Sequence, residues 1–563
     1  MEFIRMRRAT VFFLACCLLF ATHAAAQANS AAKPFDVLIT GGRIVDGTGN
    51  PWFGADVGIR DGVIAEIGSL AGRSAGRTID ARGSVVTPGF IDMMGGSSLP
   101  LLLDPVSAES KLRQGITTMM VGEGDSLAPQ NDRTAAQDIE GASFKISWRT
   151  YAQYLALLEK KGVAMNVIHN VGATQVREIV IGDEDKAPTP QQLAEMKSLV
   201  AQAMKDGSVG LSTALIYPPG TFAKTEELIE LSKVAAQYGG VYFSHMRNES
   251  THLLEAIQEV IRIGKEAGIP VHIYHLKAAG EENWPLMEQA LKLIQQAREQ
   301  GVDITADIYP YIRNGLGLRA LVHPRHFAAG SDAFVKSLAA PSFRREIRRE
   351  METTSDWENW YRWVGSNWDN VLISSVGPKG DASLNGLSVQ AAAKRRNVDP
   401  WDVFFDLIKQ GDPFVSPKSM NEGQKQAALR ASFVSIDCDA APINPANSAA
   451  SLGQSSAPRA FGTFARILAK YVREEHVISL EDAVRKMSSL PANSLKLFDR
   501  GRLSPGFRAD ILVFDPAKVQ DTATFDKPLS YSVGFDYVLV NGTLVIDNNR
   551  STGALSGSVL RHQ

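Results

Sequence analysis

The chain has 563 residues, of which 44% are hydrophobic and 21% charged, and its formal net charge is -2. This composition is ordinary for a soluble globular enzyme, and the length suffices for one large domain and a smaller one. The small net charge, without a long basic run, excludes the usual nucleic-acid-binding proteins.

The first 26 residues are predicted to be a signal peptide. Arginines at positions 5, 7 and 8 precede the apolar run Val11–Phe20, and Ala24-Ala25-Ala26 offers a cleavage site with small side chains. The apolar run is too short to span a bilayer. We therefore expect an exported protein, periplasmic or extracellular, with no transmembrane span in the mature chain; a lipoprotein signal ending at Cys16 is the second alternative. Cleavage leaves Cys438 as the one cysteine, so no intrachain disulfide is expected.

Both ends of the mature chain are predicted to form β-structure. In residues 36–88, Asp61-Gly62 is typical of a hairpin turn, and in residues 498–555 Asn541-Gly542 is another. Two β segments at opposite ends of the chain suggest one small β domain built from both.

The middle of the chain, residues 89–497, alternates strand-like runs with helices. One predicted helix begins at Thr189-Pro190 and stops at Gly207, and another spans Trp284–Gln300 and leads into the strand Val302–Asp307. Repeated βα units of this length predict a (β/α)8 barrel. Residues 320–365 are charged and rich in tryptophan, and we interpret them as an insertion near the barrel mouth.

The stretch 241–280 carries the clearest functional pattern. The strand-like runs Tyr242–His245 and Val271–His275 each stop at a histidine, and an amphipathic helix ending at Gly268 separates them. The carboxyl ends of parallel strands carry the site of such a barrel, and two imidazoles that converge there suit a catalytic zinc. Alternatively, either histidine alone could cap a strand or pack in the core.

Several longer motifs point to a known family. They include TPGFIDM at 87–93, LRQGITTMMVGEGDSLAP at 112–129, GLSTALIYPPG at 210–220, SHMRNE at 244–249, YHLKAAG at 274–280, PRAFGTF at 458–464 and LSPGFRADILVFDP at 503–516. Over nearly the whole mature chain the sequence resembles the amidohydrolase superfamily and, within it, the N-acyl-D-amino-acid deacylases (D-aminoacylases). The resemblance implies a (β/α)8 TIM-type barrel with a β-sandwich formed by the two terminal segments.

The resemblance also implies roles for individual residues. His245 and His275 match two zinc-binding histidines, and Asp439 matches the aspartate that acts as proton shuttle and general base. Three further residues match those that would hold the substrate carboxylate, namely Lys277, Tyr309 and Arg459. Each of these three could instead be an ordinary solvated or packed side chain.

The sequence departs from the family at the metal site. Met94 and Gly96 stand where the superfamily usually has a His-x-His pair, so a second metal held by that pair is not expected. The family's cysteine ligand after the second strand is also missing, and Glu123 is its natural substitute, with Asp125 as the rival. Two smaller departures are Gly315, in place of a serine, and Ala457, in place of a histidine.

These observations predict a hydrolase with one zinc per chain that cleaves the amide bond of N-acyl-D-amino acids, a small-molecule substrate. Two alternatives stay open. One is a dipeptidase for D-configured or peptidoglycan-derived peptides, whose substrate amine would need an acidic partner. The other is a metal-free binding protein on the same fold. The sequence does not indicate an oligomeric state.

Overall fold

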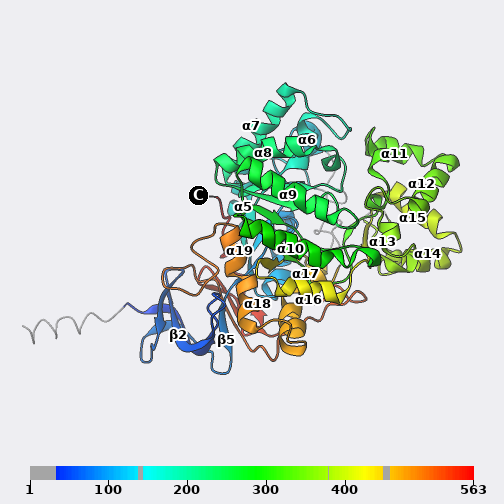
Figure 1. Cartoon of the computed structure of the whole chain (residues 1–563). Helices are drawn as coiled ribbons and strands as arrows, with labels where there is room; N and C mark the ends of the chain where they lie inside the picture. The colour runs from blue at the N-terminus through cyan, green and yellow to red at the C-terminus, as the bar shows by residue number, and fades with distance from the viewer. Residues whose placement is uncertain (1–32, 137–143, 378–379, 448–456, 563) are drawn as a thin grey trace, which may run out of the picture.

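The computed structural model describes residues 33–136, 144–377, 380–447 and 457–562 (Figure 1). The predicted signal peptide, residues 1–26, lies outside the described residues. Within the described part of the chain, no helix combines the length and the apolar composition needed to cross a membrane.

A nine-stranded sheet joins the two ends of the chain. Its strands run in the order β21-β20-β19-β18-β5-β1-β2-β3, and β4 pairs with β1. Their bounds are β1 (Phe35–Ile44), β2 (Phe53–Arg60), β3 (Val63–Gly68), β4 (Ala75–Asp80), β5 (Val85–Pro88), β18 (Ile511–Phe514), β19 (Phe535–Val540), β20 (Thr543–Asp547) and β21 (Arg550–Ser551). The join is the antiparallel pairing of β18 with β5. Both Asp61-Gly62 and Asn541-Gly542 have positive φ and connect antiparallel strands, which confirms the two predicted hairpins.

The middle of the chain forms the predicted (β/α)8 barrel. Its parallel strands lie in two sets, β6-β7-β8 and β17-β13-β12-β11-β10-β9, and only Asn170 separates β8 from β9. Their bounds are β6 (Phe90–Asp92), β7 (Ile116–Val121), β8 (Asn166–His169), β9 (Val171–Gly172), β10 (Gly210–Ala214), β11 (Val241–His245), β12 (Val271–Ile273), β13 (Ile304–Ile308) and β17 (Val434–Ile436). With β8 and β9 taken together, the described residues supply eight barrel strands.

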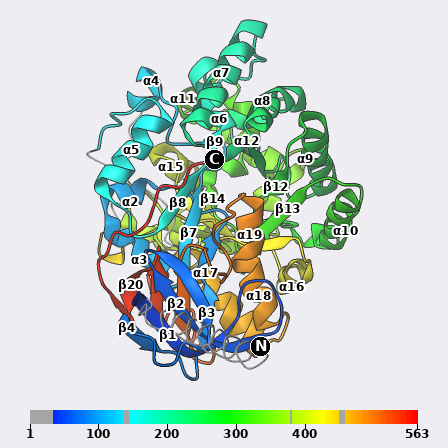
Figure 2. The same cartoon turned by 90° about the vertical axis from the view of Figure 1, so that its left-hand side faces the viewer.

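Helices surround these strands, as Figure 2 shows. Those that follow barrel strands include α2 (Leu99–Leu103), α3 (Glu109–Leu112), α5 (Tyr151–Lys161), α6 (Ala173–Val180), α7 (Pro190–Asp206), α8 (Thr225–Gln237), α9 (Leu253–Ala267), α10 (Leu286–Glu299), α16 (Glu422–Arg430), α17 (Arg459–Arg466), α18 (Leu480–Met487) and α19 (Ser489–Ser494). A π-helical segment, Ile467–Glu474, continues α17, and α4 (Asp132–Ala136) lies in the loop after β7.

The helix boundaries follow from their caps. Thr189 caps α7 through a reciprocal capping box with Gln192, and Gly207 ends the helix in the left-handed conformation. Gly268 ends α9 in the same way. The predicted helices from Thr189-Pro190 to Gly207 and between the two histidine strands are therefore confirmed.

The segment between β13 and α16 forms a separate lobe, on the right of Figure 1. It contains the strands β14 (Leu316–Gly317), β15 (Val371–Ser375) and β16 (Phe414–Pro417) and the helices α11 (Ser331–Ser337), α12 (Pro341–Thr353), α13 (Trp360–Trp363), α14 (Val389–Arg396) and α15 (Pro400–Gln410). A hydrophobic cluster of its own holds it together, with Trp357, Trp360, Trp363, Trp368 and Trp401 among its buried members. The predicted insertion at 320–365 lies inside this lobe, which extends to residue 417.

Candidate metal centre and active site

Two histidines stand at the carboxyl ends of neighbouring barrel strands. His245 is the last residue of β11, and His275 follows β12 by two residues with a φ of 37°, in the left-handed region. Buried Asp307 on β13 holds this unusual turn, because its carboxylate accepts the His275 N–H and also contacts Nε2 of His272 at 2.9 Å. The strand-end position therefore brings both imidazoles to the barrel mouth.

Glu123 lies between the two imidazoles. Its Oε1 is 2.7 Å from Nδ1 of His245 and 2.8 Å from Nε2 of His275. The loop after β7 turns sharply enough to do this because Gly124 has a φ of 76°, and a Cβ there would lie 2.5 Å from the backbone nitrogen of Ala214. Burial would raise the pKa of Glu123, but hydrogen bonds from the two histidines hold it below its ordinary value.

The donor set fits a zinc ion. One ligand atom from each of Glu123, His245 and His275 lies within 4.8 Å of the other two, and among the described residues no other group of this kind is found. Two imidazole nitrogens and one carboxylate oxygen are a common catalytic zinc set that leaves a position for water. Asp125, the rival ligand, is outside this group and is exposed.

Glu249, which was not predicted as a site residue, lies behind both imidazoles. Its Oε1 is 3.0 Å from Nδ1 of His275, and its Oε2 is 3.5 Å from Nε2 of His245. These are the ring nitrogens that do not face Glu123. Glu249 is in the SHMRNE motif, four residues after His245. This nearness to His245 in the sequence was the one signal that could have identified it as a site residue.

Lys277 forms a buried ion pair with Glu249. Its Nζ donates to Oε1 of Glu249 at 2.5 Å and lies 2.7 Å from Nδ1 of His275, and the side chain is almost fully buried. Lys277 does line the small cavity in front of the metal centre. Its ammonium is nevertheless paired with a carboxylate of the protein.

Asp439 and Arg459 face each other on the other side of the cavity. Asp439 follows β17 with a φ of 45°, and its Oδ2 is 2.7 Å from Nη1 of Arg459, the first residue of α17. Burial raises the pKa of Asp439, and the arginine opposes that rise. The guanidinium of Arg459 also lies 5.0 Å from the centre of the Tyr309 ring, and Lys277 is 5.8 Å from that ring. The three predicted carboxylate-binding residues are therefore close together.

A buried ion pair fixes the loop that carries Asp439. Asp92, at the end of β6, accepts the Cys438 N–H through Oδ1 at 2.9 Å and the Lys111 ammonium through Oδ2 at 2.8 Å. Lys111 also donates to the carbonyl of Ala440 at 2.7 Å. Both charged side chains are completely buried, so the loop is held on each side of Asp439.

The positions of the missing histidine pair are not shaped for metal ligands. Met94 is buried in a hydrophobic cluster with Met93, Met120 and Phe243. Gly96 has a φ of 68°, and a Cβ there would lie 2.9 Å from the backbone nitrogen of Ala441. A histidine at position 96 would therefore be strained as well as crowded.

The lobe between β13 and α16 reaches the site. Trp360 and Asn314 line the cavity, and the Glu358 carboxylate accepts the Glu249 N–H. This cavity has a volume of about 20 Å³, which is room for about one water molecule. Gly315 also lines it, and a Cβ there would lie 2.4 Å from Nη2 of Arg459, so a serine would displace the guanidinium.

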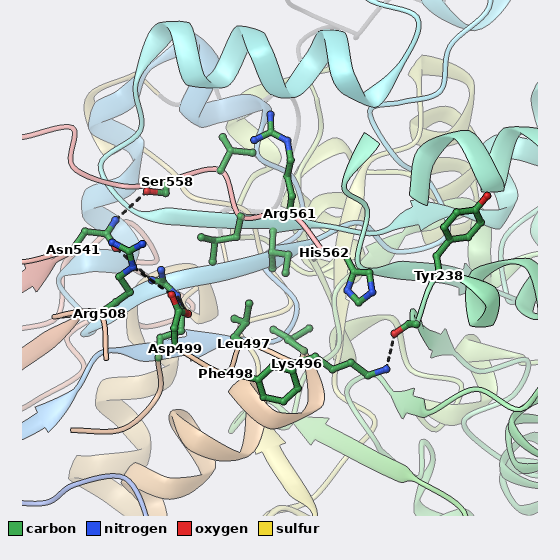
Figure 3. A pocket seen from close by; sticks show the side chains of 16 residues that line it. Tyr238, Lys496, Leu497, Phe498, Asp499, Arg508, Asn541, Ser558, Arg561 and His562 are labelled. Carbon is green, nitrogen blue, oxygen red and sulfur yellow. Dashed lines mark hydrogen bonds and ion pairs between the residues drawn. The ribbon is translucent and has the colours of Figure 1, made fainter. Parts of the chain in front are cut away.

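A larger hollow lies elsewhere in the molecule, as Figure 3 shows. Its volume is about 720 Å³, and its lining includes Tyr238, Phe498, Asn541 and the C-terminal residues 558–562. The C-terminal segment reaches it by pairing Val559 with Val167 of β8. None of the predicted site residues lines this hollow, so the volume of a cavity does not by itself identify the active site.

Comparison with known proteins agrees with this geometry. Residues 434–546 match the model of the amidohydrolase family. The chain is 33% identical to a D-aminoacylase of Alcaligenes xylosoxydans xylosoxydans, over 95% of this chain and 99% of that one. It is also 33% identical to an N-acyl-D-glutamate deacylase of the same organism, over 91% of this chain and 94% of that protein.

Two solved structures have nearly the same fold. An N-acyl-D-glutamate deacylase from Bordetella bronchiseptica, in complex with zinc and a phosphonate inhibitor, is 31% identical with a TM-score of 0.79, over 94% of this chain and 100% of that one. A D-aminoacylase studied for the role of its binuclear metal centre is 32% identical with a TM-score of 0.78, over the same shares.

Proposed function

The chain belongs to the D-aminoacylase family of amidohydrolases, and we propose that it is a zinc-dependent hydrolase that converts N-acyl-D-amino acids to a carboxylate and a D-amino acid. The observation that carries this proposal is the meeting of Glu123, His245 and His275 across the cavity from Asp439. These side chains come from four different strand ends, which is the usual construction of a barrel active site.

The zinc would be held by Glu123, His245 and His275. In such a site zinc supplies a Lewis acid that polarises the scissile carbonyl and acidifies water. We propose one zinc per chain, and the buried Met94 together with the strained backbone of Gly96 supports this number. The proposal differs from the binuclear centre described for the related D-aminoacylase.

Asp439 would move the proton. Its carboxylate takes a proton from the attacking water, whose oxygen bonds to the amide carbon, and delivers that proton to the leaving nitrogen as the C–N bond breaks. Burial raises the pKa of Asp439, with Arg459 acting in the opposite direction, and a raised pKa suits a base that works near neutral pH.

The substrate carboxylate would lie between Arg459, Tyr309 and Lys277. Arginine can bind a carboxylate with two hydrogen bonds, so Arg459 would be shared between the substrate and Asp439. Lys277 contributes positive charge from its place beside Glu249. These assignments rest on the proximity of the three side chains to one another and on the places of Lys277 and Tyr309 in the cavity wall.

A panel of N-acetyl-D- and N-acetyl-L-amino acids tests the function. Purified protein should hydrolyse D-substrates, lose activity with a chelator, and regain it on addition of about one zinc per chain. Zinc-loaded protein that hydrolyses none of the panel would refute the proposal. Activity that needs two tightly held zincs per chain would refute the single-metal site alone.

We further propose that the protein is exported and cleaved near Ala26. The arginines and the apolar run before Ala26 are typical of a signal peptide and support export. N-terminal sequencing of protein from the native cell should begin close to residue 27, and a sequence that still begins at Met1 would contradict the proposal.

A further inference from the structure

Lys425 is a buried lysine that the proposed mechanism does not use. It lies near the start of α16, the residue is only 1% exposed, and its Nζ has no hydrogen-bond partner among the described residues. Lysines are almost never fully buried unless they are paired, because removal of an amine from water without a partner costs free energy. The surroundings of Lys425 must therefore explain why a lysine stands there.

The ring of Tyr309 is the aromatic group next to this lysine. Nζ of Lys425 lies 4.6 Å from the centre of the ring, closer than the guanidinium carbon of Arg459 at 5.0 Å or Nζ of Lys277 at 5.8 Å. A cation within about 6 Å of an aromatic ring is attracted by its electrons, and more strongly where water is excluded. Arg459 and Lys277 each pair with a carboxylate as well, so the ring is the distinctive neighbour of Lys425.

Tyr309 connects this lysine to the active site. Tyr309 lines the small cavity in front of the metal centre, whereas Lys425 does not. Burial raises the pKa of the Tyr309 phenol well above its ordinary value, and although Arg459 opposes that rise, the hydroxyl stays protonated and able to donate a hydrogen bond. An effect of Lys425 on a substrate in the cavity would therefore pass through Tyr309 and not through direct contact.

The start of α16 is fixed against the loop that follows β12. Gln424, the residue before Lys425, accepts the Ala278 N–H at 2.9 Å and donates to the Ala278 carbonyl at 3.2 Å. Asn421 caps the helix, since its side chain accepts the Gln424 N–H. These contacts hold the helix start in place and, with it, the lysine beside the ring.

The charge of Lys425 depends on several neighbouring groups. Burial lowers its pKa to about 7, and the positive charge of Lys277 acts in the same direction. The carboxyl groups of Asp437, Glu422 and Glu249 oppose this change. The protonated form therefore predominates below pH 7, and an anionic substrate in the neighbouring cavity would favour it further.

We propose that Lys425 is a positioning residue for the substrate carboxylate: its ammonium holds the ring of Tyr309 by a cation–π contact and so presents the phenol hydroxyl to that carboxylate. The inference rests on the proposed function, because it requires that the carboxylate of an N-acyl-D-amino acid binds beside Tyr309. The negative charge of the bound substrate would in turn offset part of the cost of burying the ammonium.

The test compares Lys425→Met with Lys425→Arg on the best N-acetyl-D-amino acid of the panel. Methionine keeps a long side chain without the charge, whereas arginine keeps the charge and also stacks on aromatic rings. At pH 6, where most of the lysine is protonated, Lys425→Met should raise KM by about 3- to 30-fold, the effect of losing a desolvated cation–π contact. The kcat should stay within about threefold of the parent's, and Lys425→Arg should keep the parent's KM.

The pH dependence of KM gives a second measurement. As the pH rises above 7, Lys425 loses its proton, so the KM of the parent should approach that of Lys425→Met. The KM of Lys425→Arg should not rise in this way, because arginine stays charged. If Lys425→Met does not fold, this comparison of the parent with Lys425→Arg decides the question.

A double-mutant cycle tests whether Lys425 acts through Tyr309. Tyr309→Phe keeps the ring but lacks the hydroxyl that would bind the carboxylate. If Lys425 positions that hydroxyl, adding Lys425→Met to Tyr309→Phe should change KM by less than about twofold.

Lys486→Met is the matched control. Lys486 is another completely buried lysine, on α18, but its ammonium donates to the carbonyls of Ala431 and Val434 and it does not line the cavity. This variant removes a buried charge of the same kind and should keep the parent's KM. Zinc content and the free energy of unfolding are measured for each variant, because they report whether the metal centre and the fold remain.

Several results would overturn the inference. An unchanged KM in Lys425→Met would do so, as would an equal rise in Lys486→Met or an undiminished effect of Lys425→Met in the Tyr309→Phe background. In each of these cases the proposed deacylase function would stand. Loss of zinc from Lys425→Met would show that the residue supports the metal centre instead. If the zinc-loaded parent hydrolyses no N-acyl-D-amino acid, both the inference and the proposed function are wrong.

Discussion

Replacement of Glu249 by glutamine should weaken zinc binding without removing a ligand. The carboxylate contacts the ring nitrogens of His275 and His245 that face away from Glu123, at 3.0 and 3.5 Å. Such contacts orient the imidazoles and raise their basicity, and their loss typically costs 10- to 100-fold in metal affinity. That range corresponds to about 1.4 to 2.7 kcal/mol of binding free energy. Of these two contacts, only the one with His275 is a hydrogen bond, so we expect a loss within this range and not above it.

The assay is competition for zinc against a chromophoric chelator at fixed pH. Glu358→Gln is the control, because Glu358 contacts the backbone of Glu249 but neither imidazole. Burial raises the pKa of Glu358 well above its ordinary value, and the nearby Glu249 charge adds to the rise, so glutamine resembles the protonated acid. Zinc affinity of Glu249→Gln within threefold of the parent would show that the contacts with the imidazoles are not functional.

Three other substitutions test separate parts of the site. Glu123→Ala should lose both zinc affinity and activity while Asp125→Ala keeps its zinc, and the reverse pattern would identify Asp125 as the ligand. Asp439→Asn should retain zinc and lower kcat by about 10²- to 10⁴-fold, so a near-normal kcat would reject it as the base. Lys111→Met leaves the Asp92 carboxylate buried without its cation and should lower the free energy of unfolding by about 3–5 kcal/mol. Urea unfolding measures that change, and a loss below about 1 kcal/mol would contradict the role of the pair.

Local patterns were sufficient to predict the strands that carry the ligands. The strand-like runs that stop at His245 and His275 predicted both histidines at strand ends, and the structure has His245 at the end of β11 and His275 two residues after β12. The cap residues at Thr189 and Gly268 likewise predicted where helices begin and end. All of these signals lie within a few residues of the feature that they specify.

The contacts that support the site could not be predicted in this way. Lys111 reaches the carbonyl of Ala440 across 329 residues of sequence, and Glu358 reaches the backbone of Glu249 across 109. The partner of Lys277 is a further example. Its place two residues after His275 gives no sign that the fold brings the Glu249 carboxylate to it.

The pairing of β5 with β18 has a consequence for biosynthesis. About 420 residues separate these strands. At a synthesis rate of about 5–20 residues per second, β18 is therefore made roughly 20 to 80 seconds after β5. During that interval the edge of the N-terminal sheet is open to other chains. The proline at position 88 lies on that edge, opposite Ile511, and is a feature that discourages such pairing. Newly made chains that stall before residue 511 should therefore be the form most dependent on chaperones.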